Sequence, residues 1–345
     1  MEFLKIDGSY GEGGGQILRT SVALSAITKQ PIEIFAIRAK RDNPGLRAQH
    51  VKAINAVASL CDAQTENVKV GSNNIKFVPG EMHGGSIKID VGTAGSITLI
   101  LQAVIPAASL SGKYVEIELK GGTDVRWSPT IDYLRFVVRA AFGMVGIDFD
   151  IDVLRRGYYP VGGGIVKATI RSCKKPRTIN LTTVPKIEPK IVSVCSSLPA
   201  HVAQRQIAYA LTKLQKANIA CNSYSTSLEQ SSSAGSSILV YSVSNYGPFI
   251  GGDAIGERGK RAEDVGADAA EKFLEAYNSG APIDKYLADM IVLPLSFTDG
   301  KSTLMTNQAS QHLLTNLYVI SKIVGCKYDV SKVDGNYLVT IECRS

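Results

Sequence analysis

The residues best suited to chemistry begin with a histidine at the start of an apolar segment. His312 lies in the run Gln311-His312-Leu313-Leu314-Thr315-Asn316, and the apolar spacing predicts a helix over residues 312–324 that begins at this histidine. The positive end of a helix disfavours a protonated imidazole, so we expect this histidine to be neutral. A neutral imidazole is what a nucleophile needs. The position also suits a structural histidine, and the residues alone leave both interpretations open.

A second candidate group is a basic segment that ends in another histidine. Arg38, Lys40, Arg41 and Arg47 precede His50 in the chain. Arg47 and His50 are three residues apart and would share one face of a helix. The pattern indicates either a phosphate clamp or a solvated basic face.

Glycine-rich turns precede two of the predicted helices, at Gly11-Glu12-Gly13-Gly14-Gly15 and at Gly92-Thr93-Ala94-Gly95. The free N–H groups and the dipole at a helix N-terminus favour anions, so we expect an anion site where such turns meet. Standard nucleotide motifs do not fit. Leu295 stands where a P-loop needs its first glycine, and Gln16 stands where the dinucleotide fingerprint needs its third.

The segment Lys332-Val333-Asp334-Gly335 matches the lysine motif of nucleic-acid ligases, but only ten residues follow it. Asp-Gly between two apolar stretches is typical of a hairpin turn, which is the interpretation we prefer.

The composition indicates an ordinary globular protein. The 345 residues are 45% apolar and 20% charged with a net charge of +7, which excludes disordered and fibrous classes. The length suggests about two domains.

The longest apolar run, Ile97–Leu110, is too short to span a membrane, and no signal peptide is evident. Six scattered cysteines predict neither a zinc site nor a disulfide framework, so we expect buried thiols in a reducing cytoplasm.

Internal repetition organises the chain. The first copy comprises a helix, a strand, a helix and two strands, expected at Gln16–Thr28, Pro31–Ile37, Gly45–Cys61, Asn74–Val78 and Gly84–Val91. The second copy has the same order roughly 80 residues later, at Ser96–Leu110, Lys113–Leu119, Thr130–Val145, Ile147–Leu154 and Gly162–Ile170. Pro44 and Pro129 precede the second helix of each copy. These matches predict an α+β fold of repeated units.

A third copy is expected to be split. Residues 178–184 start it, and a helix at His312–Val324 with strands at Lys327–Val330 and Tyr337–Cys343 completes it. The intervening stretch has a different character, with helices at Ala200–Ala217 and Ala262–Tyr277, a strand at Ile238–Val243 and a serine-rich loop at Ser223–Ser237. We therefore predict a catalytic domain of 1–184 and 279–345 and a small α/β inserted domain of 185–278.

Five segments in this order resemble the RNA 3′-terminal phosphate cyclase family. They are Gly11–Arg19, Pro44-Gly45-Leu46 with Gln49-His50, Gly92-x-Ala94-Gly95-Ser96, Tyr158-Tyr159-Pro160-x-Gly162-Gly163-Gly164, and His312–Asn316. The resemblance covers almost the whole chain. It implies repeated units of two helices on a four-stranded sheet, three copies with the last one interrupted. Related units occur in enolpyruvyl transferases, so the fold alone does not settle the chemistry.

The resemblance also implies an activity and a set of roles. The family uses ATP to convert an RNA 3′-terminal phosphate to a 2′,3′-cyclic phosphate, through adenylyl-histidine and RNA-adenylate intermediates. His312 would be the nucleophile and Glu12 the ligand of Mg²⁺ (or Mn²⁺). The phosphate and RNA side would comprise Arg19, Arg38, Arg41, Gln49 and His50. The nucleotide pocket would comprise Gln102, Pro129, Tyr286, Leu287, Ala288, Asp289 and Met290, with adenine between Tyr286 and Pro129.

Two other interpretations stay open at this point. A non-catalytic, cyclase-like RNA-binding factor of ribosome assembly would lack the nucleophilic histidine, which this chain has. An enolpyruvyl transferase would have six units, which fits a chain of 345 residues badly. The expected partners are ATP and RNA with a 3′-terminal phosphate, with no membrane contact, and a homo-oligomer stays open.

Overall fold

The structure is a computed structural model and describes residues 2–92, 94–184 and 187–343. Three units share one order of elements. The first consists of β1 (Leu4–Asp7), α1 (Gly15–Thr28), β2 (Ile32–Phe35), α2 (Ala48–Leu60), β3 (Gln64–Glu66) and β4 (Ile75–Val78). The second consists of β5 (Gly85–Asp90), α3 (Ile97–Leu110), β6 (Val115–Gly121), α4 (Ile131–Tyr133), η1 (Leu134–Val138), α5 (Arg139–Val145), β7 (Phe149–Arg155) and β8 (Gly164–Ile170). The third consists of β9 (Asn180–Leu181), α8 (Lys285–Leu295), β14 (Gly300–Thr306), α9 (Gln311–Ile323), β15 (Lys327–Val333) and β16 (Asn336–Cys343).

The three sheets have the same topology. Their strand orders are β1-β2-β4-β3, β5-β6-β8-β7 and β9-β14-β16-β15. In each sheet the first pair is parallel and the other two pairs are antiparallel. The α+β fold of repeated units is therefore confirmed.

The boundary between the first two units differs from the expected one. Gly84–Val91 was assigned to the end of the first unit, but β5 pairs in parallel with β6 of the second sheet. The first sheet instead contains β1 and β3, which are too short to give a clear apolar period. A short strand before each glycine-rich turn is the true start of a unit.

The predicted start of the second helix at Gly45 is also wrong, because α2 begins at Ala48. Gly45 has a φ of 78°, and a Cβ there would overlap the carbonyl of Gly71. The chain around Pro44 is therefore held in a turn against the loop before β4. In the second unit the predicted helix Thr130–Val145 is present, but a π-helical turn at η1 interrupts it.

The inserted segment between β9 and α8 forms its own sheet and core. It consists of β10 (Lys190–Ser196), α6 (His201–Lys216), β11 (Ser223–Leu228), β12 (Gly235–Val243), β13 (Phe249–Ile255) and α7 (Ala262–Ser279), with strand order β11-β10-β12-β13. The serine-rich stretch is not a loop throughout, because β11 pairs in parallel with β10. Its residues are all exposed at the sheet edge, so no apolar alternation reveals it. The inserted domain was predicted to begin at residue 185. Residues 185–186 lie outside the described residues, so this boundary stays a prediction.

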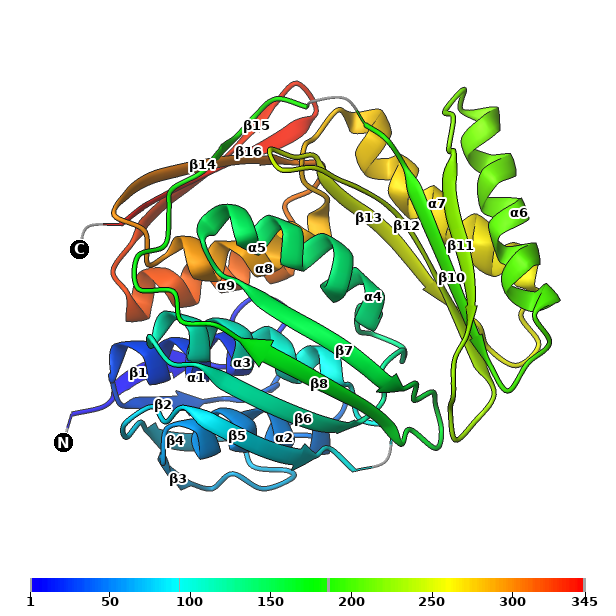
Figure 1. Ribbon diagram of the computed structural model, residues 1–345. Helices are drawn as coiled ribbons and strands as arrows, with labels where there is room; N and C mark the ends of the chain where they lie inside the picture. The colour runs from blue at the N-terminus through cyan, green and yellow to red at the C-terminus, as the bar shows by residue number, and fades with distance from the viewer. Residues whose placement is uncertain (1, 93, 185–186, 344–345) are drawn as a thin grey trace.

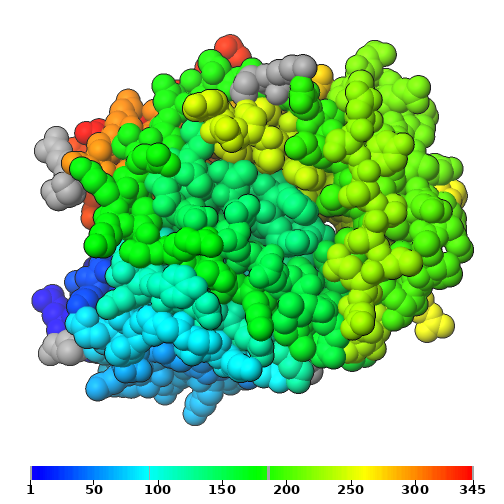
Figure 2. All heavy atoms as spheres, in the orientation of Figure 1, coloured from blue at the N-terminus to red at the C-terminus, as the bar shows by residue number. Residues whose placement is uncertain are grey.

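Helices of different units make the central core. α1 packs against α3 and α9, and α8 packs against α3, α5 and α9. Figure 1 shows these helices between the three sheets, which lie outside them. Figure 2 shows the inserted segment, in yellow-green, against the green chain of the second unit. This arrangement places the N-termini of α1 and α9 near each other.

One expectation about the cysteines is wrong. Cys326, just before β15, and Cys343, at the end of β16, form a disulfide across the open end of this hairpin. The other four cysteines are free thiols, of which Cys61, Cys173 and Cys195 are buried as expected and Cys221 is partly exposed. The sequence could not show the pair, because β15 and β16 bring these two residues together only after they associate. The turn between the two strands is Asp334-Gly335, with both φ angles positive, which confirms the hairpin interpretation.

Candidate functional site

The candidate nucleophile lies in the first turn of α9. Ser310 caps this helix by accepting a hydrogen bond from the N–H of Leu313 at 3.0 Å. The His312 side chain is about half exposed and lies between two carboxylates. Its Nδ1 is 3.6 Å from Oδ2 of Asp289, and its Nε2 is 3.7 Å from Oε2 of Glu12. The N-terminal glycine-rich turn, α8 and α9 therefore meet at this imidazole.

The pKa of His312 is shifted in the opposite direction to the expected one. The carboxylate of Asp289, with a smaller contribution from Glu12, raises the pKa of His312 above its ordinary value of 6.5. These contacts outweigh burial and the nearby charge of Arg19, which lower the pKa. The sequence argument considered only the helix dipole. It missed the carboxylates because both come from other elements.

Asp289 is held in place from several directions. It is 8% exposed on α8, and burial raises the pKa of its carboxyl. The hydroxyl of Ser310 donates to its Oδ1, and the side-chain amide of Asn316 donates to its backbone oxygen. Asp289 thus joins α8 to both ends of the His312–Asn316 segment.

The glycine-rich turn brings Glu12 to the same place. Arg41 donates to the Glu12 backbone oxygen at 2.9 Å and to its Oε2 at 3.0 Å. Glycine is required at Gly15 because the side chains of His50 and Arg19 approach the backbone closely there. A Cβ on Gly15 would overlap Nε2 of His50 and would lie 3.2 Å from a terminal nitrogen of Arg19. The first turn of α1 is therefore surrounded by nitrogen donors.

Arg19 is a buried cation at this turn. It is 7% exposed, and burial lowers its pKa to about 10. One terminal nitrogen donates to Gln16, while the buried Nε has no hydrogen-bond partner among the described residues. An orphaned buried donor beside a helix N-terminus fits an anionic ligand.

The other predicted phosphate residues have distinct roles. His50 is buried, and burial with the nearby charges of Arg19, Arg38 and Arg47 lowers its pKa to about 3. Arg38 donates to the backbone oxygens of Asn43 and Gly45 and so holds its own loop. Gln49 is exposed on α2 beside His50. The structure therefore gathers Arg19, Arg41 and His50 around Gly14 and Gly15, whereas Arg38 is bonded to its own loop.

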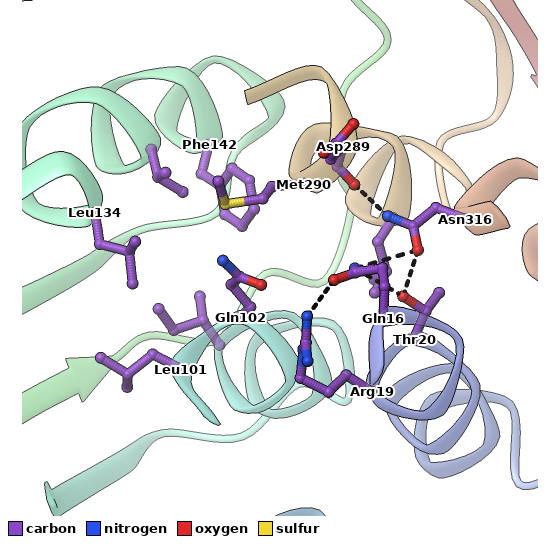
Figure 3. A pocket seen from close by; sticks show the side chains of 13 residues that line it. Gln16, Arg19, Thr20, Leu101, Gln102, Leu134, Phe142, Asp289, Met290 and Asn316 are labelled. Atoms are coloured by element: carbon purple, nitrogen blue, oxygen red, sulfur yellow. Dashed lines mark hydrogen bonds between the residues drawn. The ribbon is translucent and has the colours of Figure 1, made fainter. Parts of the chain in front are cut away.

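A small cavity of about 20 Å³ lies between α1, α3, η1 and α8, which is roughly the space of one water. Gln102, Asp289 and Met290 line it, as Figure 3 shows. Lining side chains must therefore move before a group larger than a water can enter there.

The sequence analysis missed three polar residues of this cavity. Asn316 accepts hydrogen bonds through its Oδ1 from Gln16 at 3.2 Å and from Thr20 at 2.7 Å. Gln16 and Asn316 belong to segments that were singled out as motifs, so a signal existed, but no role had been given to either.

The remaining nucleotide residues lie along α8 and the loop before α4. Leu287 and Ala288 are fully buried, so neither residue presents any surface to a ligand in this structure. Tyr286 is 37% exposed in the first turn of α8.

Pro129 is half-buried, and its carbonyl accepts a hydrogen bond from Thr98 at 2.9 Å. The N–H of Thr130 donates to Asp253, a residue that also influences Tyr286 electrostatically. Pro129 and Tyr286 therefore border the same carboxylate.

No cluster of three metal-ligating side chains occurs among the described residues. Glu12 is the carboxylate that faces the phosphate-side cations, and its side chain is 44% exposed. One carboxylate is sufficient for a cation that keeps most of its waters and binds phosphate oxygens, as Mg²⁺ does. The donor set thus fits such a cation only together with a phosphate ligand.

The fold and site define a protein of repeated β-α-β-α-β-β units whose helix N-termini converge on a histidine and a cluster of cations. A family model described as RNA 3′-terminal phosphate cyclase matches residues 10–330. Among curated relatives, an RNA 3′-terminal phosphate cyclase of Pyrococcus furiosus is 43% identical over 94% of both chains. One of Methanopyrus kandleri is 40% identical over 100% of this chain and 99% of its own. The chain therefore belongs to the RNA 3′-terminal phosphate cyclase family. None of the described helices is long and apolar enough to cross a membrane.

Proposed function

We propose that this protein converts the 3′-terminal phosphate of RNA to a 2′,3′-cyclic phosphate and consumes ATP, with His312 as the nucleophile. The observation that carries the proposal is the position of His312, which lies between Asp289 and Glu12 beside the orphaned donor of Arg19. Full-length similarity to proteins named for this reaction supports it.

In the first step, Nε2 of His312 attacks the α-phosphorus of ATP. Nδ1 faces Asp289, so the carboxylate favours a proton on Nδ1 and leaves the Nε2 lone pair free for attack. A nitrogen–phosphorus bond forms, the α–β bridging bond breaks, and pyrophosphate leaves. Asp289 also stabilises the positive charge that the imidazole acquires during attack.

In the next two steps the RNA end is activated and closed. An oxygen of the 3′-phosphate attacks the adenylyl phosphorus, which restores His312 and yields an RNA-adenylate. The neighbouring 2′-hydroxyl then attacks the 3′-phosphorus, AMP leaves, and the hydroxyl proton is released. Arg19 and Arg41 are suited to bind the phosphates through these steps, because guanidinium groups match phosphate oxygens. His50 can supply a neutral N–H donor.

We assign Glu12 to Mg²⁺ or Mn²⁺ held jointly with the phosphates of ATP. When bound, the cation supplies positive charge that offsets the charge of the phosphates. Arg41 contacts the same oxygen of Glu12 that faces His312, so it must share or release this oxygen. A cytoplasmic location and a homo-oligomer stay predictions.

The alternative is a non-catalytic RNA-binding factor with this fold. Incubation with ATP radiolabelled at the α-phosphate and Mg²⁺, followed by a denaturing gel, separates the two. We expect a labelled band that is lost in His312→Ala and kept in His201→Ala, which changes an exposed histidine of α6. A folded wild-type protein without label would favour the binding factor. Label retained in His312→Ala would place the nucleophile elsewhere.

A further inference from the structure

Asp284, the residue before α8, is a buried carboxylate with partners in three parts of the molecule. It is 2% exposed. Its Oδ1 caps α8 by accepting hydrogen bonds from the N–H groups of Tyr286 at 2.9 Å and Leu287 at 3.0 Å. The hydroxyl of Tyr133, in the second unit, donates to the carboxylate and lies 2.7 Å from Oδ1 and 2.8 Å from Oδ2. The N–H of Gly251, in the inserted segment, donates to Oδ2 at 2.9 Å. The second unit, the third unit and the inserted segment therefore meet at one carboxylate.

Capping of α8 does not by itself account for these contacts. A helix cap needs one acceptor oxygen, which asparagine or serine supplies as well as aspartate does. Oδ2 of Asp284 instead accepts from Tyr133 and Gly251, which belong to other elements. Burial raises the pKa of Asp284 to about 6 against the effect of its donors, so the carboxylate is ionised at neutral pH. Hydrogen bonds to an ionised acceptor are stronger than those between neutral groups. The second oxygen therefore serves the contact between elements.

The side chain of Tyr133 is held as closely as the carboxylate. It is 1% exposed, and its ring lies against the backbone of β13, where a Cβ on Gly251 would be 2.9 Å from Cε2 of the ring. A backbone hydrogen bond from Phe249 to Pro282, at 2.8 Å, also joins β13 to the chain before α8. The helical turn η1, which continues α4, packs against both β13 and α8 (Figure 1). A shift of Tyr133 or of the start of α8 would therefore disturb both.

The two bonded segments carry the residues between which the family resemblance places adenine. Pro129 precedes Tyr133 in the same turn, and Tyr286 follows Asp284 in the first turn of α8. The hydroxyl of Thr130, next to Pro129, accepts a hydrogen bond from the N–H of Tyr133 at 3.3 Å, so Pro129 adjoins a capped turn. The bond between Tyr133 and Asp284 therefore determines the spacing between Pro129 and Tyr286.

The contact with the nucleophile depends on other groups. Asp289 lies further along α8, and Ser310 and Asn316 hold it beside His312. The bond between Tyr133 and Asp284 therefore bears on the base of the nucleotide, whereas the contact between Asp289 and His312 has its own supports.

We propose that Asp284 is a positioning residue for the base of ATP, which acts through Tyr133 by holding Pro129 and Tyr286 at the spacing that a bound base requires. Walls that are already in place lower the cost of binding, because less ordering accompanies it. The proposal rests on the proposed function for the identity of the nucleotide. It also gives the inserted segment a part in ATP binding, because Gly251 donates to the same carboxylate.

Tyr133→Phe tests the bond alone, because it removes one hydroxyl and keeps the cap of α8. We expect the ATP concentration for half-maximal self-adenylylation to rise by roughly tenfold, the order that a hydrogen bond to a charged group contributes. The maximal rate and the pH midpoint should stay as in the wild type, because Asp289 keeps its contacts. Inorganic tripolyphosphate, which has no base, should inhibit both proteins at the same concentration.

Tyr241→Phe is the matched control for this variant. It removes the hydroxyl of another buried tyrosine, whose ring stacks on Phe136 where the second unit meets the inserted segment. It should need no more ATP than the wild type. An unchanged requirement for ATP in Tyr133→Phe, or an equal loss of inhibition by tripolyphosphate, would overturn the proposal.

Asp284→Asn separates positioning from capping. Asparagine is an equally good cap, so a capping role alone predicts wild-type behaviour. With Oδ1 kept at the helix, the amide nitrogen replaces Oδ2 and places a donor against the N–H of Gly251. We therefore expect the requirement for ATP to rise as in Tyr133→Phe, in a protein whose thermal unfolding verifies the fold. A folded Asp284→Asn protein that needs no more ATP than the wild type would show that this residue only caps α8.

Calorimetric binding of ATP to proteins that carry His312→Ala needs no reaction, so it separates failure of this proposal from failure of the proposed function. If Tyr133→Phe weakens binding but the wild type is never labelled, the base site stands and the chemistry of His312 does not. If the wild type is labelled and Tyr133→Phe and Asp284→Asn leave the binding of ATP unchanged, the chemistry stands and Asp284 has no positioning role.

Discussion

Oδ2 of Asp289 lies 3.6 Å from Nδ1 of His312, and this contact joins α8 to the first turn of α9. The two residues are on different helices of the third unit, and the hydroxyl of Ser310 and the amide of Asn316 hold Asp289 in place. The relationship determines both which nitrogen of the imidazole is free and how easily the ring is protonated. Several of its consequences can be measured.

The first step should depend on pH through His312. Asp289 raises the pKa of His312 above 6.5, and the protonated ring cannot attack. Self-adenylylation should therefore increase as the pH rises through this raised pKa. Asp289→Asn removes the charge, so the midpoint of the pH profile should move to lower pH while the maximal rate falls. The measurement is the initial rate of labelling across pH, with the exposed Asp299→Asn as control. A midpoint that stays in place would show that another group titrates.

Gly15 should be essential for activity but not for folding. A Cβ there would overlap His50 and approach Arg19, so Gly15→Ala should displace both side chains. We expect cyclisation to fall on the order of a hundredfold, as is typical when catalytic groups shift by about 1 Å. Alanine also favours a helix relative to glycine, so thermal stability should change little. Gly14→Ala is the matched control, because its Cβ would meet only Arg41 at an ordinary 3.7 Å. Equal activity of the two variants would contradict the predicted role of Gly15.

His50 should make the protein sensitive to acid. Its pKa is about 3 in the folded protein against 6.5 ordinarily, so the unfolded chain takes up a proton that the folded protein excludes. The stability is therefore complete above pH 6.5 and is lost as the pH falls toward 3. Between pH 7 and pH 5 the loss from this group is about 2 kcal/mol. His50→Gln should remove this part of the pH dependence in denaturant unfolding, whereas His201→Gln should keep it. Parallel pH profiles of wild type and His50→Gln would refute the assignment.

The disulfide should contribute to stability. It closes a segment of 17 residues between Cys326 and Cys343, for which loop-closure entropy gives about 3 kcal/mol. Reduction should lower the free energy of unfolding by this order and expose two further thiols to titration. Cys326→Ala should be insensitive to reductant, whereas Cys221→Ala, which changes a free cysteine, should respond as the wild type does. An oxidised wild-type protein with six titratable thiols would show that the pair is not bonded.

The sequence by itself determined the repeat, the interruption of the third unit and the motifs of the family. The period of apolar residues and the positions of glycines are local properties of the sequence. The predicted ends of α1, α3 and α9 therefore lie within one or two residues of the observed ones. The contacts between units are different. That Asp289 and Glu12 face opposite nitrogens of His312, that His50 approaches Gly15, and that Cys326 meets Cys343 depend on how helices and strands of distant segments associate. A linear pattern contains no such distances. The direction of the pKa shift of His312 was therefore misjudged from its own helix, because the electrostatic field at the ring comes mainly from side chains that tertiary packing brings to it.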